Sequence, residues 1–299
     1  MEQRIPKLTA CIMAVFTFLF GMGAYEILHF PHDTRSLSLH NAASAYDRSI
    51  LRNNPAALSM SAEKTVYSYL VLPAGIHSGE IQRVYKVASG IHAGKLSYIS
   101  YGTIVDGKTY ETTSAYDMLL EIGYKKELKN IISVGISGGY LLSSISGYRS
   151  QLLYTNIGLR SRMMRKRIGM GFSLENVGFL LTSYTDMKEP IPAIFRSACY
   201  YRPKYFPVII SIDIIHNMDR DAKIISGGLE INPENWLTFR LGCSSNRTGF
   251  LTGDFSSNWL TDVSGGIGFQ FNQMNLDVGF MNLGAAGYVF GFSLSREVD

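Results

Sequence analysis

The sequence predicts an all-β protein, a fourteen-stranded antiparallel transmembrane β-barrel, and three observations lead to that prediction. Apolar side chains alternate with polar or small ones along many short segments, as in strands with one apolar face. Only 17% of the 299 residues are charged, whereas Gly (29), Tyr (18) and Phe (16) are abundant. Short turns alternate with long loops between the segments, which is typical of outer-membrane barrels.

The composition argues against two other classes of protein. A mean hydropathy of +0.06 is far below that of a helical membrane protein. The charged fraction of 17% is below the quarter or so that is usual in soluble proteins. The net charge of +4 is too small to indicate a nucleic-acid partner.

Residues 1–24 are predicted to be a secretory signal peptide. Arg4 and Lys7 precede the apolar run TACIMAVFTFLFGMGA, which ends at Ala24. A positive start, a short apolar stretch and small residues at its end are the features of such a signal. The run is shorter than the 20 or so apolar residues of a membrane-spanning helix. We therefore expect Sec-type export.

Residues 63–299 are predicted to form the barrel. Strand patterns lie at 65–72, 81–90, 94–102, 115–125, 130–141, 148–159, 166–175, 192–202, 206–215, 223–231, 235–243, 262–271, 274–282 and 287–295. The pattern is weak between 81 and 102. An even number of strands is what a single-chain bacterial barrel needs. A soluble β-sandwich or lipid-binding barrel remains an alternative, because single-strand signals are weak.

The stretch GGIGFQFNQMNLDVGF at 265–280 shows the alternation clearly. It raises the question whether the apolar face meets a protein core or lipid. Phe269, Phe271, Leu276 and Val278 share the apolar parity, and Gln270 lies on the polar one. We expect the apolar set to face lipid and the polar set to face the lumen.

The lengths of the connections support the barrel independently. Short connections lie at 126–130, 202–206, 231–236 and 272–275, and long ones at 103–114, 176–191 and 244–261. The segment 283–286 is a short exception among the long ones. We expect the long loops to face outward. The basic run RSRMMRKR at 160–167 is then expected to be a turn at the other end, held in water or against anionic headgroups.

Three motifs that suggest chemistry have simpler explanations. Gly135-Ile136-Ser137-Gly138-Gly139 fits the nucleophile elbow of hydrolases, but Tyr140 and Leu141 continue a strand where that motif needs a helix. His29, His32 and Asp33 lack the further ligands of a metal site. Cys199 and Cys243 either pair or serve as small strand residues, and the second reading is favoured. We predict no enzyme, catalytic residue, cofactor or metal.

Residues 25–62 do not alternate, and they carry a family resemblance. The stretch NNPAALS after FPHDTRSLSL resembles the opening motif of the PorV/PorQ group of outer-membrane proteins. The matching residues are Pro31, Arg35, Asn54, Pro55, Ala56 and Leu58. Later stretches also match in order, and EPIP, NPENWLTFRLG and GAAG are more similar to PorQ than to PorV. The stretch SLSLHN departs from the Ala-Leu-Gly-Gly of the family.

The resemblance implies a FadL-like barrel with residues 25–62 as a plug in its lumen. It also implies a non-enzymatic component of the type IX protein secretion system, in the outer membrane of a diderm bacterium, that anchors or assembles a surface attachment complex. The expected partners are outer-membrane lipid and a surface protein of that machinery. The alternative is a FadL-like channel for small hydrophobic molecules, which fold analogy alone favours.

The longest loop, at 244–261, is the candidate partner-binding surface. Phe250, Phe255 and Trp259 stand there among small polar residues, a mixture suited to protein contact. The alternative is a loop that caps the barrel mouth and packs its aromatic side chains there.

Overall fold

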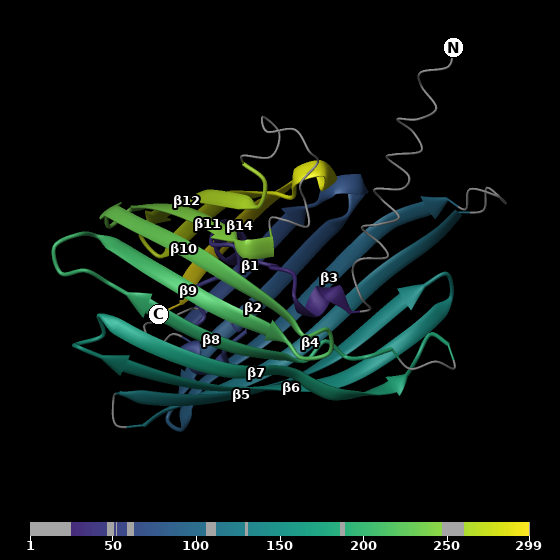
Figure 1. The fold of residues 1–299 in the computed structure, drawn as a ribbon, viewed down its shortest axis with the longest axis horizontal. Helices are drawn as coiled ribbons and strands as arrows, with labels where there is room; N and C mark the ends of the chain where they lie inside the picture. Colours follow the sequence, from purple (N-terminus) through teal and green to yellow (C-terminus); the bar gives the residue numbers. More distant parts are fainter. Residues whose placement is uncertain are drawn as a thin grey trace, which may run out of the picture.

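The chain forms one closed barrel of fourteen antiparallel strands (Figure 1). This computed structural model describes residues 25–46, 51, 53–58, 63–105, 112–128, 131–185, 189–246 and 260–298. Each strand pairs with its neighbours in sequence, and β1 (Glu63–Val71) closes the barrel against β14 (Tyr288–Val298). The predicted transmembrane barrel is confirmed. Within the described part of the chain, no helix is long and apolar enough to cross a membrane.

Each of the fourteen predicted segments overlaps one observed strand. The remaining strands are β2 (His77–Val87), β3 (Gly90–Val105), β4 (Thr112–Leu128), β5 (Ile132–Ile145), β6 (Tyr148–Met163), β7 (Ile168–Thr182), β8 (Ile194–Tyr201), β9 (Val208–Asn217), β10 (Ala222–Glu234), β11 (Leu237–Ser244), β12 (Val263–Phe271) and β13 (Met274–Asn282). The weak region 81–102 forms β2 and β3. Several strands are longer than predicted, among them β6, which the lumen-facing Arg160 and Arg162 continue beyond the apolar pattern.

Alternating side chains give the wall an apolar outer face and a polar inner face. On β4, Leu120 and Ile122 point outward and are 52% and 68% exposed. Asp117, Glu121 and Lys125 on the other parity are buried in the lumen. Exposed large hydrophobic residues recur on every strand, as a lipid-facing wall requires. The polar side chains, which the bilayer would exclude, fill the interior instead.

The β12–β13 hairpin follows the same rule, and its predicted faces are confirmed. Phe271, Leu276 and Val278 are exposed on the outer face, and Phe269 is half-buried between the rings of Trp236 and Phe271. Gln270 lies on the inner parity at the end of β12.

A charge on this outer face is expected to destabilise the barrel strongly. Val278→Arg should cost about 2–4 kcal/mol of folding free energy, because it places a cation in the hydrocarbon layer. Gln270→Arg is the matched control on the inner parity and should cost little. Urea-dependent folding into lipid vesicles measures both. A larger loss for Gln270→Arg would invert the assignment of the faces.

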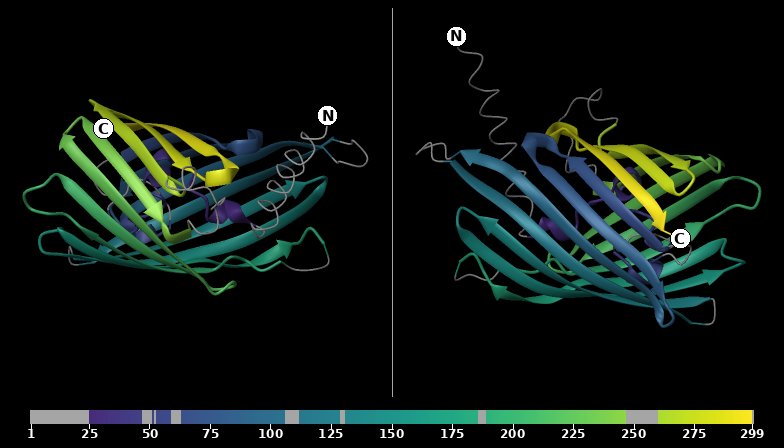
Figure 2. Two further views of the ribbon diagram at one scale, coloured as in Figure 1. Left: turned by 45° about the horizontal axis from the view of Figure 1, so that its top comes forward. Right: turned by 180° about the vertical axis from the view of Figure 1, so that it is seen from behind.

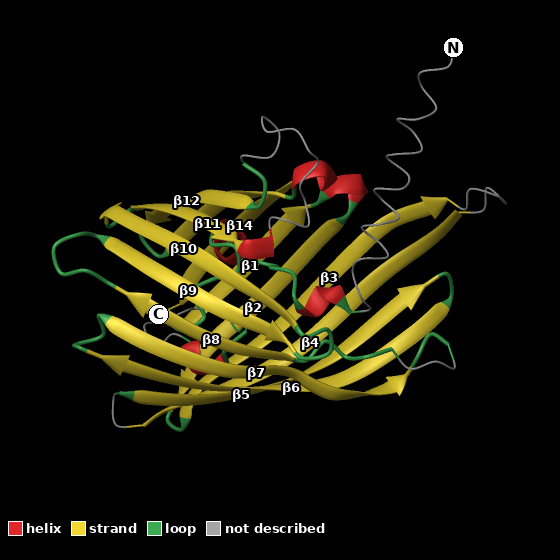
Figure 3. Cartoon of the chain, in the orientation of Figure 1, coloured by secondary structure: helices red, strands yellow, loops and turns green. Residues whose placement is uncertain are grey.

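The two ends of the barrel differ in their connections. One end, here the long-loop end, carries the connections after β3, β7 and β11, together with the tight turn at 146–147. The other end, here the short-turn end, carries only short connections, which follow the even-numbered strands. Figure 3 distinguishes the strands from these loops. The turn predicted at 160–167 is shorter than expected, since β6 extends to Met163.

The extension of β6 to Met163 has a physical cause in the lumen. Arg160 and Arg162 are part of β6 and point inward, where both are buried. Arg160 donates to Ser133 Oγ at 3.2 Å, and Arg162 forms an ion pair with Glu127. The expectation that all the cations of this run lie in a solvated turn was therefore wrong for these two.

The N-terminal segment lies inside the barrel, where Figures 1 and 2 show it in purple. It contains η1 (Glu26–Leu28), α2 (Thr34–Ser38) and η2 (Pro55–Ala57). Asp33 caps α2 by accepting the Ser36 N–H at 2.8 Å. Two further single turns, η3 (Pro73–Gly75) and η5 (Gly284–Ala286), lie in the β1–β2 and β13–β14 connections at the long-loop end.

The described part of this segment crosses the lumen from end to end. Tyr25 hydrogen-bonds Ser150 near the start of β6, at the long-loop end. The carbonyl of Leu58 accepts from Lys125 near the end of β4, at the short-turn end. We call residues 25–58, as far as they are described, the plug. Residues 1–24 lie outside the described residues, so the signal peptide stays a prediction.

Candidate functional site

The plug fits the wall closely because glycines face it from the strands. At each of these positions a Cβ would crowd a plug atom: Gly123, Gly135, Gly158, Gly171, Gly228, Gly242, Gly266, Gly279 and Gly291. Glycine in a strand often marks the close approach of another backbone. The high glycine content of the sequence therefore has a second role besides strand formation, since it makes room for the plug.

The family-motif residues at the end of the plug lie against this glycine surface. Asn54 caps η2 by accepting the Ala56 N–H at 3.0 Å, and it donates to the Leu159 carbonyl at 3.2 Å. A Cβ at Gly135 would overlap Pro55 and Ala56. These three motif residues are thus held by β5 and β6.

Hydrogen bonds to the plug backbone complete the attachment. The Ala56 carbonyl accepts from Ser133 Oγ at 3.0 Å. The Leu58 carbonyl accepts from Lys125 Nζ at 2.6 Å, and Leu58 itself is fully buried. Pro31, the first residue of the matched motif, is also buried.

Arg35, the remaining motif residue, anchors α2 through a chain of buried charges. Its guanidinium donates to both carboxylate oxygens of Glu230, at 3.0 and 3.2 Å. Glu230 also accepts from Arg240 at 2.8 Å, and Arg240 pairs with Asp277. Burial alone would lower the pKa of Arg35, but the Glu230 carboxylate outweighs that effect and raises it. The plug therefore carries a cation whose compensating carboxylate, Glu230, belongs to the wall.

A second charged group ties the middle of the plug to β7, β8 and β9. Arg196 forms a two-point ion pair with Glu175, at 2.8 and 3.2 Å, and lies 3.6 Å from Asp213. Asp213 accepts the backbone N–H groups of Ala43, at 2.9 Å, and Ser44. A wall carboxylate thus satisfies plug donors that no regular secondary structure would satisfy.

The third charged group lies on β3 and β4. Lys95 Nζ is 2.6 Å from Glu121, which also accepts from Ser137 at 2.7 Å and from Asn156 at 3.0 Å. Ser137 is the serine of the stretch 135–139, which fits the nucleophile-elbow motif but was predicted to be part of a strand. It lies on the inward parity and serves this network, as the strand reading of that motif predicts.

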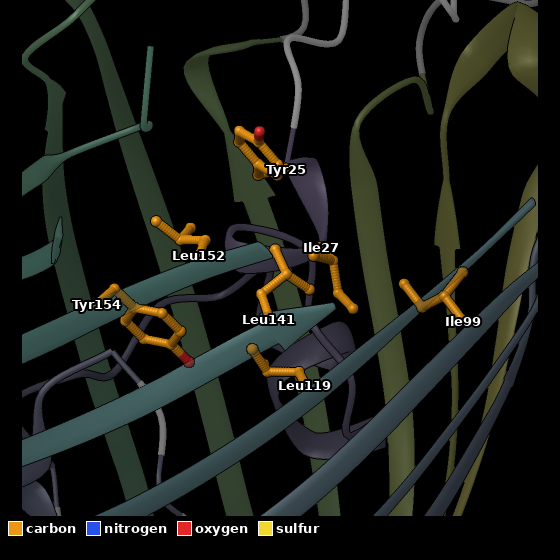
Figure 4. Packing of buried hydrophobic residues seen from close by; sticks show 7 residues of the cluster. All are labelled: Tyr25, Ile27, Ile99, Leu119, Leu141, Leu152 and Tyr154. Atoms are coloured by element: carbon orange, nitrogen blue, oxygen red, sulfur yellow. The ribbon is translucent and has the colours of Figure 1, made fainter. Parts of the chain in front are cut away.

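An apolar cluster occupies the lumen nearer the long-loop end. Figure 4 shows its buried members from the plug and from β3 to β6: Tyr25, Ile27, Ile99, Leu119, Leu141, Leu152 and Tyr154. The partly buried Leu28, Ile76, Tyr101, Leu180, Tyr184 and Ile191 pack against them. We call this packed group of side chains the apolar chamber. Its members are hydrophobic and aromatic, like the residues that usually line small-molecule sites.

A few polar groups lie beside the apolar chamber. Tyr25 Oη is 2.7 Å from Ser150 Oγ, and the Tyr25 ring stacks on Tyr184 with centroids 6.4 Å apart. Asp117 accepts from Tyr101 at 2.8 Å. Burial raises the pKa of both Tyr25 and Tyr184, so their hydroxyls stay neutral at physiological pH.

A small cavity lies beside the apolar chamber. A cavity of about 20 Å³ lies between the plug and the wall, among Ile27, Leu119 and Tyr154 on its apolar side and Lys95 and Glu121 on its polar side. This volume suits a single water molecule and no hydrocarbon. A larger molecule does not fit this cavity while the plug residues stay in place.

The other sequence candidates are placed elsewhere. His32 contacts Ser78 Oγ at 3.1 Å and the Ile27 carbonyl at 2.7 Å. In the described part of the chain no group of three or more side chains could hold a metal ion. Cys199 and Cys243 are exposed and unpaired on the outer face. The loop residues Phe250, Phe255 and Trp259 lie outside the described residues.

Sequence reasoning missed the charged groups of the lumen. Their signal was present: Glu121, Glu175, Asp213, Glu230 and Arg240 all interrupt apolar strands on one parity. A charged residue in a strand that otherwise faces lipid has to point inward, and there it needs a partner. The partners, however, lie far apart in the sequence.

Comparisons with known proteins support the fold. No family model matches the chain, and no curated protein matches its sequence. The toluene transporter TbuX of Ralstonia pickettii shares the fold with a TM-score of 0.64 and 10% identity, over 89% of this chain and 98% of that one. The toluene transporter TodX of P. putida has a TM-score of 0.60 and 11% identity, over 89% and 98%. The monoaromatic hydrocarbon channel CymD has a TM-score of 0.57 and 11% identity, over 89% and 97%. The chain therefore has the FadL-like fourteen-stranded barrel fold.

Proposed function

We propose that this protein is an outer-membrane channel for small apolar molecules, with its long-loop end outward and its plug as the gate. The observation that carries the proposal is the packed group of apolar side chains at the long-loop end of the lumen, which lies above a layer of ion pairs. An apolar solute would partition into the chamber from the water around the loops. The structural neighbours named for toluene and monoaromatic hydrocarbons support the same class of substrate.

The chamber alone does not form a path, so the plug has to take part. The cavity described between plug and wall is too small for a hydrocarbon, and the plug backbone packs tightly against the glycines of the wall. Passage then requires the plug to shift while the barrel stays closed. The ion pair of Arg35 with Glu230, and the hydrogen bonds from Ala43 and Ser44 to Asp213, limit that shift in the resting state, which prevents the barrel from leaking polar solutes.

Uptake by cells that produce the protein tests the proposal. Leu119→Asn and Leu141→Asn each place an amide in the chamber and should reduce the uptake of radiolabelled toluene several-fold. Ala93→Ser, a conservative change in the lumen nearer the short-turn end, is the control. All variants must show the heat-modifiable mobility of a folded barrel. The channel would be refuted if the wild type took up no more toluene than cells without the protein. It would also be refuted if neither Leu119→Asn nor Leu141→Asn reduced the uptake.

A second candidate function is the anchoring of a surface protein in type IX secretion. The observation that favours it is the tight plug, whose motif residues Asn54, Pro55 and Ala56 pack directly against glycines of the wall. A filled barrel is a rigid platform, and recognition would then fall to the loops.

The test of this candidate is the loop at 244–261. Replacing Phe250, Phe255 and Trp259 with Ser should release a bound surface protein into the medium while the barrel remains folded. Unchanged retention of surface proteins would refute the anchoring role. Toluene uptake by the same triple variant separates the two candidates, because the channel function does not need this loop to bind a protein.

A further inference from the structure

Two neighbouring turns at the short-turn end bring five cations together. The β6–β7 turn and the β8–β9 turn are joined by hydrogen bonds from Arg202 N–H to the Arg167 carbonyl, at 2.7 Å, and from Tyr200 Oη to the Lys166 carbonyl, at 3.2 Å. The cations, which we call the basic rim, are Arg165, Lys166, Arg167, Arg202 and Lys204. Neither turn contains an acidic residue.

Four cations of the basic rim are exposed and Arg167 is half-buried, in contrast to the buried cations that precede them on β6. Arg160 and Arg162 are buried, with Ser133 and Glu127 as partners. Among the described residues, no carboxylate lies within ion-pair distance of a basic-rim cation. A concentration of like charge without compensation within the protein favours an anionic partner.

Exposed apolar side chains accompany these charges. Met164, Tyr205 and Phe206 are 71%, 82% and 68% exposed, and Lys204 Nζ lies 5.1 Å from the centre of the Tyr205 ring. The basic rim follows directly on the lipid-facing band of the wall, because Tyr201 at the end of β8 still points outward and is 49% exposed. After the lipid-facing end of β8, cations and exposed aromatic residues thus stand side by side in the turn.

We propose that the basic rim binds the headgroups of anionic phospholipids in the adjoining leaflet. Tyrosine and phenylalanine at the edge of a lipid-facing band suit the headgroup level, and cations just beyond it meet the phosphates. An acidic protein would also meet the charge, but it would not explain why the basic rim continues the lipid-facing band. The site fixes the depth of the barrel in the membrane on the side of β6 to β9.

Lipid-dependent thermal stability of the purified full-length protein tests this proposal. Phosphatidylglycerol or phosphatidylcholine with identical acyl chains is titrated into the micelles, and the midpoint of heat unfolding is recorded. The wild type should gain stability from phosphatidylglycerol only. A variant with Arg165→Ser, Lys166→Ser, Arg202→Ser and Lys204→Ser should need about tenfold more phosphatidylglycerol for the same shift. The control Arg220→Ser with Lys223→Ser, at the opposite end, should behave as the wild type.

Three outcomes would overturn the proposal. The first is a phosphatidylglycerol shift that is undiminished in the fourfold variant. The second is a wild type that responds equally to both lipids. The third is binding of a polyglutamate peptide by the basic rim without any response to phosphatidylglycerol, which would assign this surface to an acidic protein. None of these outcomes depends on whether the lumen conducts.

Discussion

Replacing Gly135 with Leu is expected to expel the end of the plug from the lumen. The new side chain would enter the space of Pro55 and Ala56, and the atoms that it meets are backbone, which cannot yield by a change of rotamer. Overpacking of this kind costs about 1–3 kcal/mol even where neighbours relax. Displacement of the plug relieves the overlap at the cost of the hydrogen bonds from Ser133 and Lys125.

Limited proteolysis and single-channel conductance measure this displacement. The variant should be cleaved within residues 25–62 and should conduct ions, while the wild type resists the protease and stays closed. Gly138→Ala is the control on the same strand, since a Cβ there meets only the Tyr154 carbonyl at 3.9 Å. A Gly135→Leu protein that is as resistant and as closed as the wild type would contradict the tight contact between plug and wall.

Glu230→Gln is expected to destabilise the barrel by about 3–5 kcal/mol, since removing one partner of a buried ion pair leaves charges uncompensated. Arg35 loses its carboxylate altogether, and Arg240 keeps only Asp277. Glu234→Gln is the matched control, because Glu234 lies exposed at the end of the same strand. Chemical unfolding in micelles measures both changes.

A double variant tests the origin of that loss. Arg35→Met removes the cation that Glu230→Gln leaves unpaired, so the combined loss should be clearly smaller than the sum of the two single losses. Strict additivity would show that the two residues do not act as a pair, and the assignment of Arg35 as the anchor of α2 would fail.

The barrel could be predicted from the sequence because its determinants are local. Ile168, Met170 and Phe172 report their common face by simple alternation, and the pairing of successive strands follows from the short turns. The inward position of Ser137 followed from the same rule. Strand ends were less predictable. Arg160 and Arg162 were assigned to a turn because their partners in the lumen, Ser133 and Glu127, cannot be identified from the sequence.

The arrangement of the lumen could not be predicted, because its contacts join residues far apart in the chain. Arg35 and Glu230 are separated by 195 positions, and Ser44 and Asp213 by 169. Alternation says that Glu230 points inward, but it carries no information on which cation meets it. The glycines carried equally little information, since parity does not distinguish Gly135, which contacts the plug, from Gly139, which also points inward but faces the Tyr154 ring of the wall.

Locking the plug to the wall tests the central claim, that apolar molecules pass only when the plug moves. A Cβ at Gly266 would lie 2.9 Å from Ser38 Cβ, so a small shift gives the separation of a disulfide. The pair Ser38→Cys with Gly266→Cys, made after Cys199→Ser and Cys243→Ser, can then be oxidised in the membrane. The account predicts that oxidised cells lose uptake of the apolar tracer and that a reductant restores it. Full uptake with the disulfide verified by mass spectrometry would contradict the account.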